Sequence, residues 1–207
     1  GDVAKALEFQ IKESAVTGKV FGENDPETLT SLNNLALFYM DSGDYSRAIE
    51  MEEKVYKARA DTLGAEDPET LVCLCNLAMM ENAVNNHQKA LEINKTVYTA
   101  RRRILGEEHE DTLTSLNNIA VTYMNLGSYK NAAALCQKVC TARKKCQGEK
   151  HPDTLLSLIN LATSYVYLGE YKKAEHIFAE AYEPCAKVYG KEHPTVLRLL
   201  NNLARVY

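Results

Sequence analysis

Apolar residues recur along this chain at helical spacing, in two kinds of segment that alternate. The first kind carries apolar residues three or four positions apart: Leu29, Leu32, Leu35, Ala36 and Tyr39. The second kind carries a similar apolar face: Ala48, Met51, Val55 and Ala58. Residues at this spacing share one side of an α-helix. The pattern therefore predicts pairs of amphipathic helices, the first beginning at Pro26 and ending at Gly43, the second ending at Leu63.

The residues at the predicted helix ends favour the same interpretation. Asp25 stands before Pro26; Asp is a preferred N-cap, and proline suits the first helical position. Later segments carry histidines at this place, which we interpret as N-caps: His109, His151 and His193. The glycines that close the first helices are expected to adopt a left-handed C-terminal cap: Gly43, Gly127 and Gly169.

The whole pattern repeats every 42 residues, a period marked by five glycines: Gly22, Gly64, Gly106, Gly148 and Gly190. A fixed period of this kind indicates an array in which each unit buries its apolar face on its neighbours. We predict a single array over 1–207, divided as follows: partial repeat 1–21, repeats 22–63, 64–105, 106–147 and 148–189, and partial repeat 190–207. Because both ends fall inside a repeat, we expect a fragment of a longer protein.

Alanine occupies one position of each predicted helix. In the first helices these residues are Ala36, Ala78, Ala120, Ala162 and Ala204. In the second helices they are Ala48, Ala90, Ala132 and Ala174. Small side chains at both positions let two helix backbones approach closely, so we expect the hairpins to close at these alanines.

Two departures from the pattern carry their own predictions. The second repeat has Glu81, Asn85 and His87 where its neighbours carry Tyr, Gly and Tyr. We expect a looser hairpin there, with Asn85 or Asn86 replacing the turn glycine. In the fourth repeat, Pro184 lies deep in the second helix, and proline removes a backbone hydrogen bond. A kink or break near Glu183 is therefore expected.

The motif Leu32-Asn33-Asn34-Leu35-Ala36, followed by Tyr39 and by Gly43-x-Tyr45-x-x-Ala48, resembles the tetratricopeptide repeat. The 42-residue period with His151-Pro152-Asp153-Thr154-Leu155 is similar to the longer variant found in kinesin light chains and in repeat tails of some signalling proteins. The resemblance covers the whole chain. It implies an all-α fold, a right-handed α-solenoid of stacked antiparallel hairpins, acting as a scaffold that holds peptides in a concave groove.

The resemblance also implies which residues line that groove. One row is a ladder of asparagines: Asn34, Asn76, Asn118, Asn160 and Asn202. The neighbouring row is more variable: Asn33, Cys75, Asn117, Ile159 and Asn201. Further apolar groove positions are Leu37, Met40, Met79, Val121, Met124, Leu156 and Val166. A side-chain amide offers both a donor and an acceptor to a peptide backbone. The alternative is that the amides bond between repeats, and the apolar residues pack on a neighbouring helix.

Composition and charge narrow the function classes. The net charge of −4 provides no basic surplus for nucleic acid, and no apolar run approaches the length that spans a bilayer. We interpret the cationic runs Arg101–Arg103 and Arg143–Lys145 as solvated helix C-termini. The six cysteines fit reduced thiols in a cytoplasmic protein.

No pattern of catalytic, metal-binding or cofactor-binding residues occurs, so we predict no enzyme and no cofactor. Two functions remain open. The chain is a scaffold for a protein or peptide partner, similar to kinesin light chain cargo adaptors. Alternatively, it is a regulatory or oligomerising segment of a larger signalling ATPase or enzyme, with self-association through its uncapped ends.

Overall fold

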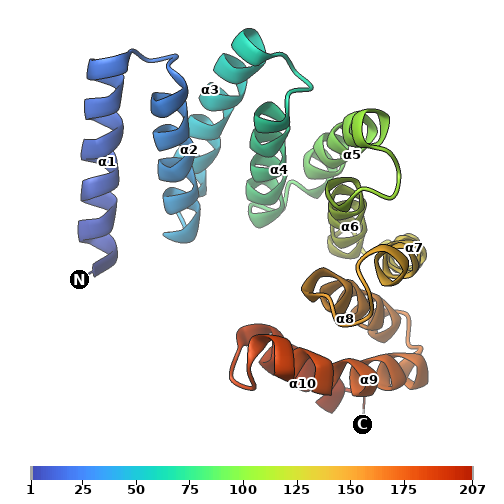
Figure 1. The fold of residues 1–207 in the computed structure, drawn as a ribbon. Coiled ribbons are helices and arrows are strands. Elements are labelled where there is room, and N and C mark those ends of the chain that lie inside the picture. The colour runs from blue at the N-terminus through green and yellow to red at the C-terminus, as the bar shows by residue number, and fades with distance from the viewer. Residues whose placement is uncertain (1, 207) are drawn as a thin grey trace. The chain divides into compact units, whose positions relative to one another are not determined.

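The structure is a computed structural model that describes residues 2–206, with side chains from Lys5 onward (Figure 1). These residues form helices and no strand. The helices are α1 Asp2–Phe21, α2 Pro26–Asp41, α3 Tyr45–Leu63, α4 Pro68–Ala83, α5 His87–Leu105, α6 Glu110–Asn125, α7 Tyr129–Cys146, α8 Pro152–Tyr167, α9 Tyr171–Tyr189 and α10 Pro194–Ala204. The predicted fold class and the alternation of first and second helices are thereby confirmed.

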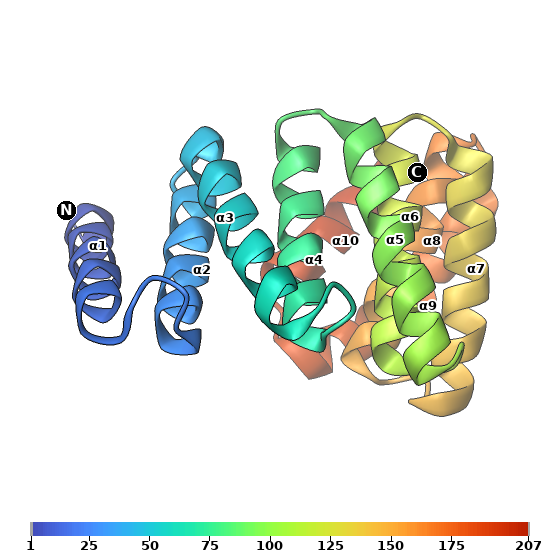
Figure 2. The same cartoon turned by 90° about the horizontal axis from the view of Figure 1, so that it is seen from above.

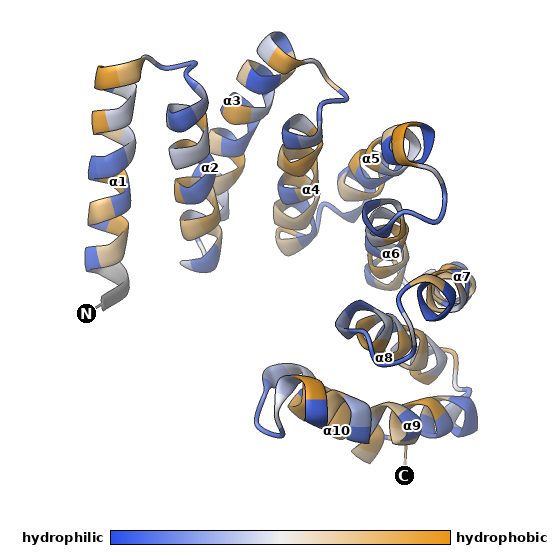
Figure 3. Ribbon diagram, in the orientation of Figure 1, coloured by the Kyte–Doolittle hydropathy of each residue, from blue (hydrophilic) through white to orange (hydrophobic). Residues whose placement is uncertain are grey.

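The chain divides into two compact units, unit 1 over Gly1–Ala100 and unit 2 over Arg101–Tyr207. Consecutive helices pack against each other from α1 to α4 and from α6 to α10, and a first helix also contacts the next first helix, α2 with α4 and α6 with α8. Figure 2 shows the same helices from above, and in Figure 3 the loop between α7 and α8 is hydrophilic while apolar turns lie along the helices.

The helix caps follow the sequence prediction. Each predicted N-cap side chain accepts a hydrogen bond from the backbone N–H two residues later: Asp25, Asp67, His109, His151 and His193. The turn glycine Gly43 has φ of 85°, and in the second hairpin Asn85 adopts φ of 63° in its place. Asn tolerates this left-handed region better than most residues, so the prediction of an asparagine substitute is confirmed.

An ion pair replaces an aromatic contact in that second hairpin. Glu81 is buried, and its carboxylate lies 2.6 Å from Lys89 Nζ and accepts from Asn86 Nδ2 at 2.7 Å. The same two repeat positions elsewhere place a cation over a tyrosine ring: Arg47 over Tyr39, and Lys173 over Tyr165. The pair supplies the buried carboxylate with charged and amide partners, as burial requires. That this hairpin is looser stays a prediction.

Helix α9 corrects part of the expectation for Pro184. The helix runs from Tyr171 to Tyr189 with Pro184 inside it, so the predicted break is wrong. The proline lacks the N–H that would bond the Glu180 carbonyl, and Glu180 lies on the exposed side of the helix, where a carbonyl without a donor costs less than in the core. Phe178 and Cys185, both fully buried on either side of the proline, anchor the helix in the core.

Three buried arginines correct the interpretation of the cationic runs. Arg59, Arg101 and Arg143 share one repeat position and are between 3% and 9% exposed, so they are not solvated. Arg143 Nη1 donates to the Asp153 carbonyl at 2.9 Å and to Ser157 Oγ at 2.8 Å, and its Nη2 donates to Thr114 Oγ1 at 2.8 Å. One guanidinium thus joins α6, α7 and α8. Their neighbours in the runs, such as Lys144, are exposed as expected.

The two alanine rows lie in the core, as the close approach of paired helices requires. Ala36 and Ala48 belong to one cluster and are fully buried, and Ala120 is 0% exposed against Cys136 and Cys140. Ala204, at the end of α10, is exposed.

Ala120→Leu is expected to destabilise the chain by about 1–3 kcal/mol, because a larger side chain overpacks the contact between α6 and α7. Urea unfolding followed by circular dichroism measures the loss, with the exposed Ala134→Leu on α7 as the control. An unchanged unfolding midpoint for Ala120→Leu would show that the alanine does not set the helix separation.

Candidate functional site

The two asparagine rows bond to each other across adjacent first helices. In unit 1, Asn76 Nδ2 on α4 donates to Asn33 Oδ1 on α2 at 3.0 Å. In unit 2, Asn160 Nδ2 on α8 donates to Asn117 Oδ1 on α6 at 3.1 Å. We call these the amide pairs of units 1 and 2. All four side chains are half-buried. In each pair the later asparagine donates and the earlier one accepts, which leaves the Nδ2 of Asn33 or Asn117 and the Oδ1 of Asn76 or Asn160 for another partner.

The remaining members of the rows are placed differently. Asn34 and Asn201 are exposed and Asn118 is half-buried. Asn202, 8% exposed, donates to Thr163 Oγ1 at 3.4 Å. Its partner position on α8 holds an isoleucine, so no second amide is available there.

Ile159 does not lie on the groove surface. It is 1% exposed in the core cluster of unit 2, packed with Ala162 and Val196. Its assignment as a ligand-binding residue is wrong. The repeat position that Ile159 shares with Asn117 lies at the edge of the buried face. An aliphatic side chain at this position turns into the core, away from water, while an amide stays at the surface.

A pocket of about 390 Å³ in unit 2 brings together six of the predicted residues. It is lined by side chains of α6, α8 and α10: Asn117, Val121, Met124, Leu156, Asn160, Thr163, Tyr167, Arg198 and Asn202. The amide pair of unit 2 therefore stands beside apolar side chains and one cation. The pocket also contains Arg198, together with Thr163 and Tyr167, which were not predicted from the sequence.

Neighbouring contacts fix two walls of this pocket. The ring of Tyr167 stacks on Tyr129 with centroids 4.7 Å apart and planes 8° apart. Ser164 Oγ contacts Met124 Sδ at 3.2 Å, which positions the thioether. Tyr167 could have been noticed in the sequence as an unusual groove residue. It is an aromatic residue at a position that holds Asp41, Ala83 and Asn125 in other repeats.

The predicted groove residues of unit 1 are arranged less uniformly. Leu37 and Met40 pack partly buried against the core cluster that contains Met80, and Cys75 packs against the cluster of Leu74. Met79 is 48% exposed. The alternative that some of these residues pack on neighbouring helices therefore applies to Leu37 and Met40.

The amide pair of unit 1 differs from that of unit 2 by a buried carboxyl. Asn76 Nδ2 also lies 3.1 Å from Glu52 Oε1 on α3. Glu52 is 0% exposed, and burial raises its pKa to about 7, although the hydrogen bond from Asn76, the neighbouring Cys73 thiol and the charge of Arg59 oppose the rise. In unit 2, the same repeat position holds Cys136.

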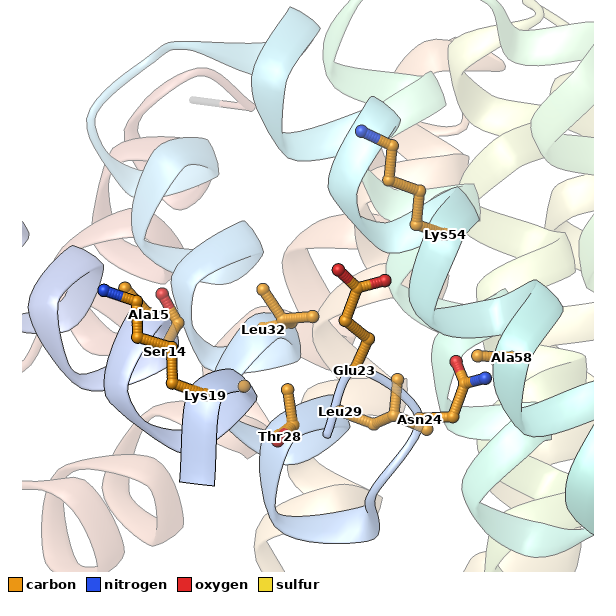
Figure 4. A pocket seen from close by; sticks show the side chains of 11 residues that line it. Ser14, Ala15, Lys19, Glu23, Asn24, Thr28, Leu29, Leu32, Lys54 and Ala58 are labelled. Carbon is orange, nitrogen blue, oxygen red and sulfur yellow. The ribbon is translucent and has the colours of Figure 1, made fainter. Parts of the chain in front are cut away.

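A second kind of pocket lies between successive second helices. In unit 1, α1 and α3 flank α2 around a cavity of about 620 Å³ with Leu29 and Leu32 as its floor. Figure 4 shows Lys19 and Lys54 at opposite sides and the Glu23 side chain between them. Equivalent residues line pockets at α3–α5 and at α7–α9. Because it recurs at matching repeat positions, we attribute this pocket to the packing of the hairpins.

Burial keeps two cysteines of unit 2 in their neutral form. Burial raises the pKa of Cys136 to about 11 and that of Cys140 to about 12, so both stay protonated thiols near neutral pH. Within residues 2–206, no cluster of His, Cys, Asp and Glu is arranged to hold a metal ion. No helix of that range combines the length and hydropathy needed to cross a bilayer.

The repeats match a known family along most of the chain. The model of the tetratricopeptide repeat matches residues 1–61, 33–103, 69–123 and 111–183. The chain belongs to the tetratricopeptide repeat family. No curated protein matches the sequence significantly. Tetratricopeptide repeats typically serve as non-enzymatic interaction scaffolds. This chain has the architecture of such repeats.

Solved structures identify the variant of tetratricopeptide repeat. The chain is similar to a kinesin light chain-like protein of Podospora anserina with nearly identical repeats, at 29% identity and a TM-score of 0.77 over 90% of this chain and 88% of that chain. It also matches BtubC (BKLC) from P. vanneervenii, at 19% identity and a TM-score of 0.79 over 98% and 83% of the two chains. The tetratricopeptide repeats are thus kinesin light chain-like.

A third solved structure is more distant in sequence. A Rap protein in complex with Competence and Sporulation Factor is 15% identical, with a TM-score of 0.73 over 99% of this chain and 58% of that chain. At this identity the likeness concerns the fold. The match to the tetratricopeptide repeat family and the kinesin light chain-like repeats support a protein-interaction scaffold.

Proposed function

We propose that the first-helix face of this scaffold binds an extended peptide, and that the pocket of unit 2 is its main contact. The observation that carries the proposal is the meeting of an amide pair, apolar side chains and an unpaired cation in one cavity, lined by Asn117, Asn160, Met124 and Arg198. Ligand sites are commonly apolar with a few placed polar groups. The free cysteines support a cytoplasmic setting.

The amide pair supplies backbone recognition. Asn160 donates one N–H to Asn117 Oδ1, and this bond fixes both amide planes. Asn117 Nδ2 remains as a donor and Asn160 Oδ1 as an acceptor. An extended peptide presents a C=O and an N–H that match these two atoms. Because the asparagines already hold each other, the peptide gains its hydrogen bonds with little loss of side-chain entropy.

The side chains of the pocket indicate the composition of the peptide. Val121, Met124, Leu156 and Tyr167 offer an apolar surface, and methionine adapts to differently shaped partners. Arg198 is exposed and forms no ion pair within the described part of the chain. We therefore propose a peptide with apolar anchors and an acidic residue toward α10.

The double variant Asn117→Ala plus Met124→Glu is expected to weaken peptide binding by about tenfold or more, because it removes the amide pair and places a charge in the apolar wall. The probe is a set of dodecapeptides selected by phage display against the full chain, measured by calorimetry. A matched control, Asn131→Ala plus Val188→Glu, alters exposed residues of α7 and α9. Equal affinities of the two variants would contradict binding at this pocket.

One observation favours the second function, an oligomerising or regulatory segment. Helix α1 exposes several large apolar side chains: Phe9, Ile11, Val16, Val20 and Phe21. A mass that rises with concentration in light scattering would support self-association over peptide binding.

A further inference from the structure

Glu52 is a buried carboxyl tied directly to a groove amide. It projects from α3 between α2 and α4 and is 0% exposed. Its Oε1 accepts from Asn76 Nδ2 at 3.1 Å, and the same Nδ2 donates to Asn33 Oδ1 at 3.0 Å. Its Oε2 is buried without a hydrogen-bond partner. The two hydrogens of one amide nitrogen are thus divided between a groove asparagine and a carboxyl, and the carboxyl's unsatisfied second oxygen can compete for the hydrogen given to Asn33.

The charged groups around Glu52 leave it without a full counter-ion. Arg59 on the same helix directs Nη2 to Glu69 Oε2 at 3.3 Å and Nη1 to Cys73 Sγ at 3.4 Å. Cys73, on α4, stays a neutral thiol because burial raises its pKa to about 11. From α2, the contacts to this cluster come from the uncharged Thr30 and Asn33. A change of protonation in this cluster near neutral pH therefore belongs to Glu52.

We propose that Glu52 makes the amide pair of unit 1 acid-responsive: loss of its proton draws the Asn76 amide onto the carboxylate and away from Asn33. An ionised oxygen is a stronger acceptor than a neutral one, and a buried charge without a counter-ion seeks every available donor. In the neutral acid, the carboxyl hydroxyl donates to the nearby thiol, and Asn76 stays with Asn33. The raised pKa of about 7 places this change within the physiological range.

Unit 2 supplies an internal control. Its amide pair has the same geometry, Asn160 Nδ2 to Asn117 Oδ1 at 3.1 Å. At the repeat position of Glu52, unit 2 carries Cys136, a neutral thiol that is 0% exposed. The two pairs thus differ in the presence of an ionisable carboxyl, so a pH effect confined to Asn76 separates the carboxyl from general effects of pH.

For its functional consequence, the inference rests on the proposed peptide binding. A peptide that bonds to the amide pair of unit 1 meets Asn76 in its groove-facing position when Glu52 is neutral. When Glu52 is charged, that amide is held by the carboxylate. Peptides that depend on Asn76 are therefore expected to bind more tightly at pH 6 than at pH 8, and peptides that depend on Asn117 are expected to bind equally.

Side-chain amide resonances of the full chain test the coupling without any ligand. In ¹⁵N-labelled protein, the Nδ2 signals of Asn76 are expected to shift between pH 5.5 and 8.5 with a midpoint near 7, and those of Asn160 to remain constant. Glu52→Gln is expected to abolish the shift of Asn76. A constant Asn76 signal in the wild type, or a shift that survives in Glu52→Gln, would overturn the inference.

Binding measurements test the consequence separately. Dodecapeptides selected by phage display at pH 6 are sorted by loss of binding in Asn76→Ala or in Asn117→Ala. The first class is expected to lose about fivefold in affinity from pH 6 to pH 8, and the loss is expected to vanish in Glu52→Gln. Equal affinities of this class at both pH values would overturn the inference. If no peptide depends on either asparagine, the proposed function fails, and the amide resonances alone decide the coupling.

Discussion

Replacing Arg143 by alanine is expected to lower the free energy of unfolding by about 3 kcal/mol or more. The guanidinium is 3% exposed and donates to the Asp153 carbonyl, Ser157 Oγ and Thr114 Oγ1, at 2.9, 2.8 and 2.8 Å. Truncation removes three hydrogen bonds between three helices and opens a cavity among them. Urea unfolding of the full chain, followed by circular dichroism at 222 nm, measures the effect.

The chain itself suggests a variant that restores this contact. In the last repeat, the positions of Arg143 and Ser157 hold Cys185 and Leu199, both 0% exposed in one apolar cluster. The double variant Arg143→Cys plus Ser157→Leu is therefore expected to recover more than half of the lost stability, because an apolar pair of suitable volume replaces a buried polar one. Additive losses in the double variant would show that the two positions do not act as a pair. The exposed Lys144→Ala is the control and is expected to change stability by less than about 0.5 kcal/mol.

The parts of the fold that depend on local chemistry were predictable from the sequence. The caps at Asp25 and His151 and the left-handed Asn85 follow from the side chain and its nearest backbone groups, and the structure shows them as predicted. Helix α9 shows the limit of such reasoning. The effect of Pro184 depends on whether the carbonyl left without a donor faces water, and that is set by how the helix packs.

The buried arginines were not predicted, because a cation in a last helical turn looks the same in sequence whether it is solvated or inserted between repeats. The partner of Arg143 lies fourteen residues later, in the next hairpin. The sequence contains one signal of this contact. Cys185 and Leu199 together replace Arg143 and Ser157 at the equivalent positions of the next repeat. Two positions that change together at a fixed offset indicate contact in a repeat array.

The candidate site was predictable as a surface and not as a set of contacts. Helical spacing placed the asparagine rows on one face, and the pocket of unit 2 contains Asn117, Asn160 and Asn202. The bond from Asn160 to Asn117 depends on the distance between α6 and α8, which periodicity does not supply. The same missing distance led to the wrong placement of Ile159. Its repeat position lies at the edge of the core, where the distance to the neighbouring helix decides whether the side chain is buried or exposed.

Glu52→Gln is expected to stabilise unit 1 above neutral pH and to have little effect in acid. The pKa of Glu52 is raised in the folded chain, from a usual value of 4.5 to about 7, chiefly by burial. Between these values the folded state binds more protons than the unfolded state, so wild-type stability falls as pH rises through this window. The loss is complete above pH 7 and amounts to about 3 kcal/mol. Glutamine keeps the size and the acceptor oxygen of the side chain and carries no charge.

The measurement is urea unfolding of the wild type and of Glu52→Gln at pH 5, 6, 7 and 8. The stability difference in favour of Glu52→Gln is expected to grow with pH, by up to about 1.4 kcal/mol per pH unit, and to level off near pH 8. The control is Glu50→Gln on the same helix, where an exposed carboxylate pairs with Lys54 at 2.7 Å, which lowers its pKa. That group is ionised throughout the range, so its variant is expected to show no such growth. A difference for Glu52→Gln that stays constant from pH 5 to pH 8 would mean that the buried carboxyl does not titrate in the folded chain, and the acid response of the unit 1 amide pair would then have no source.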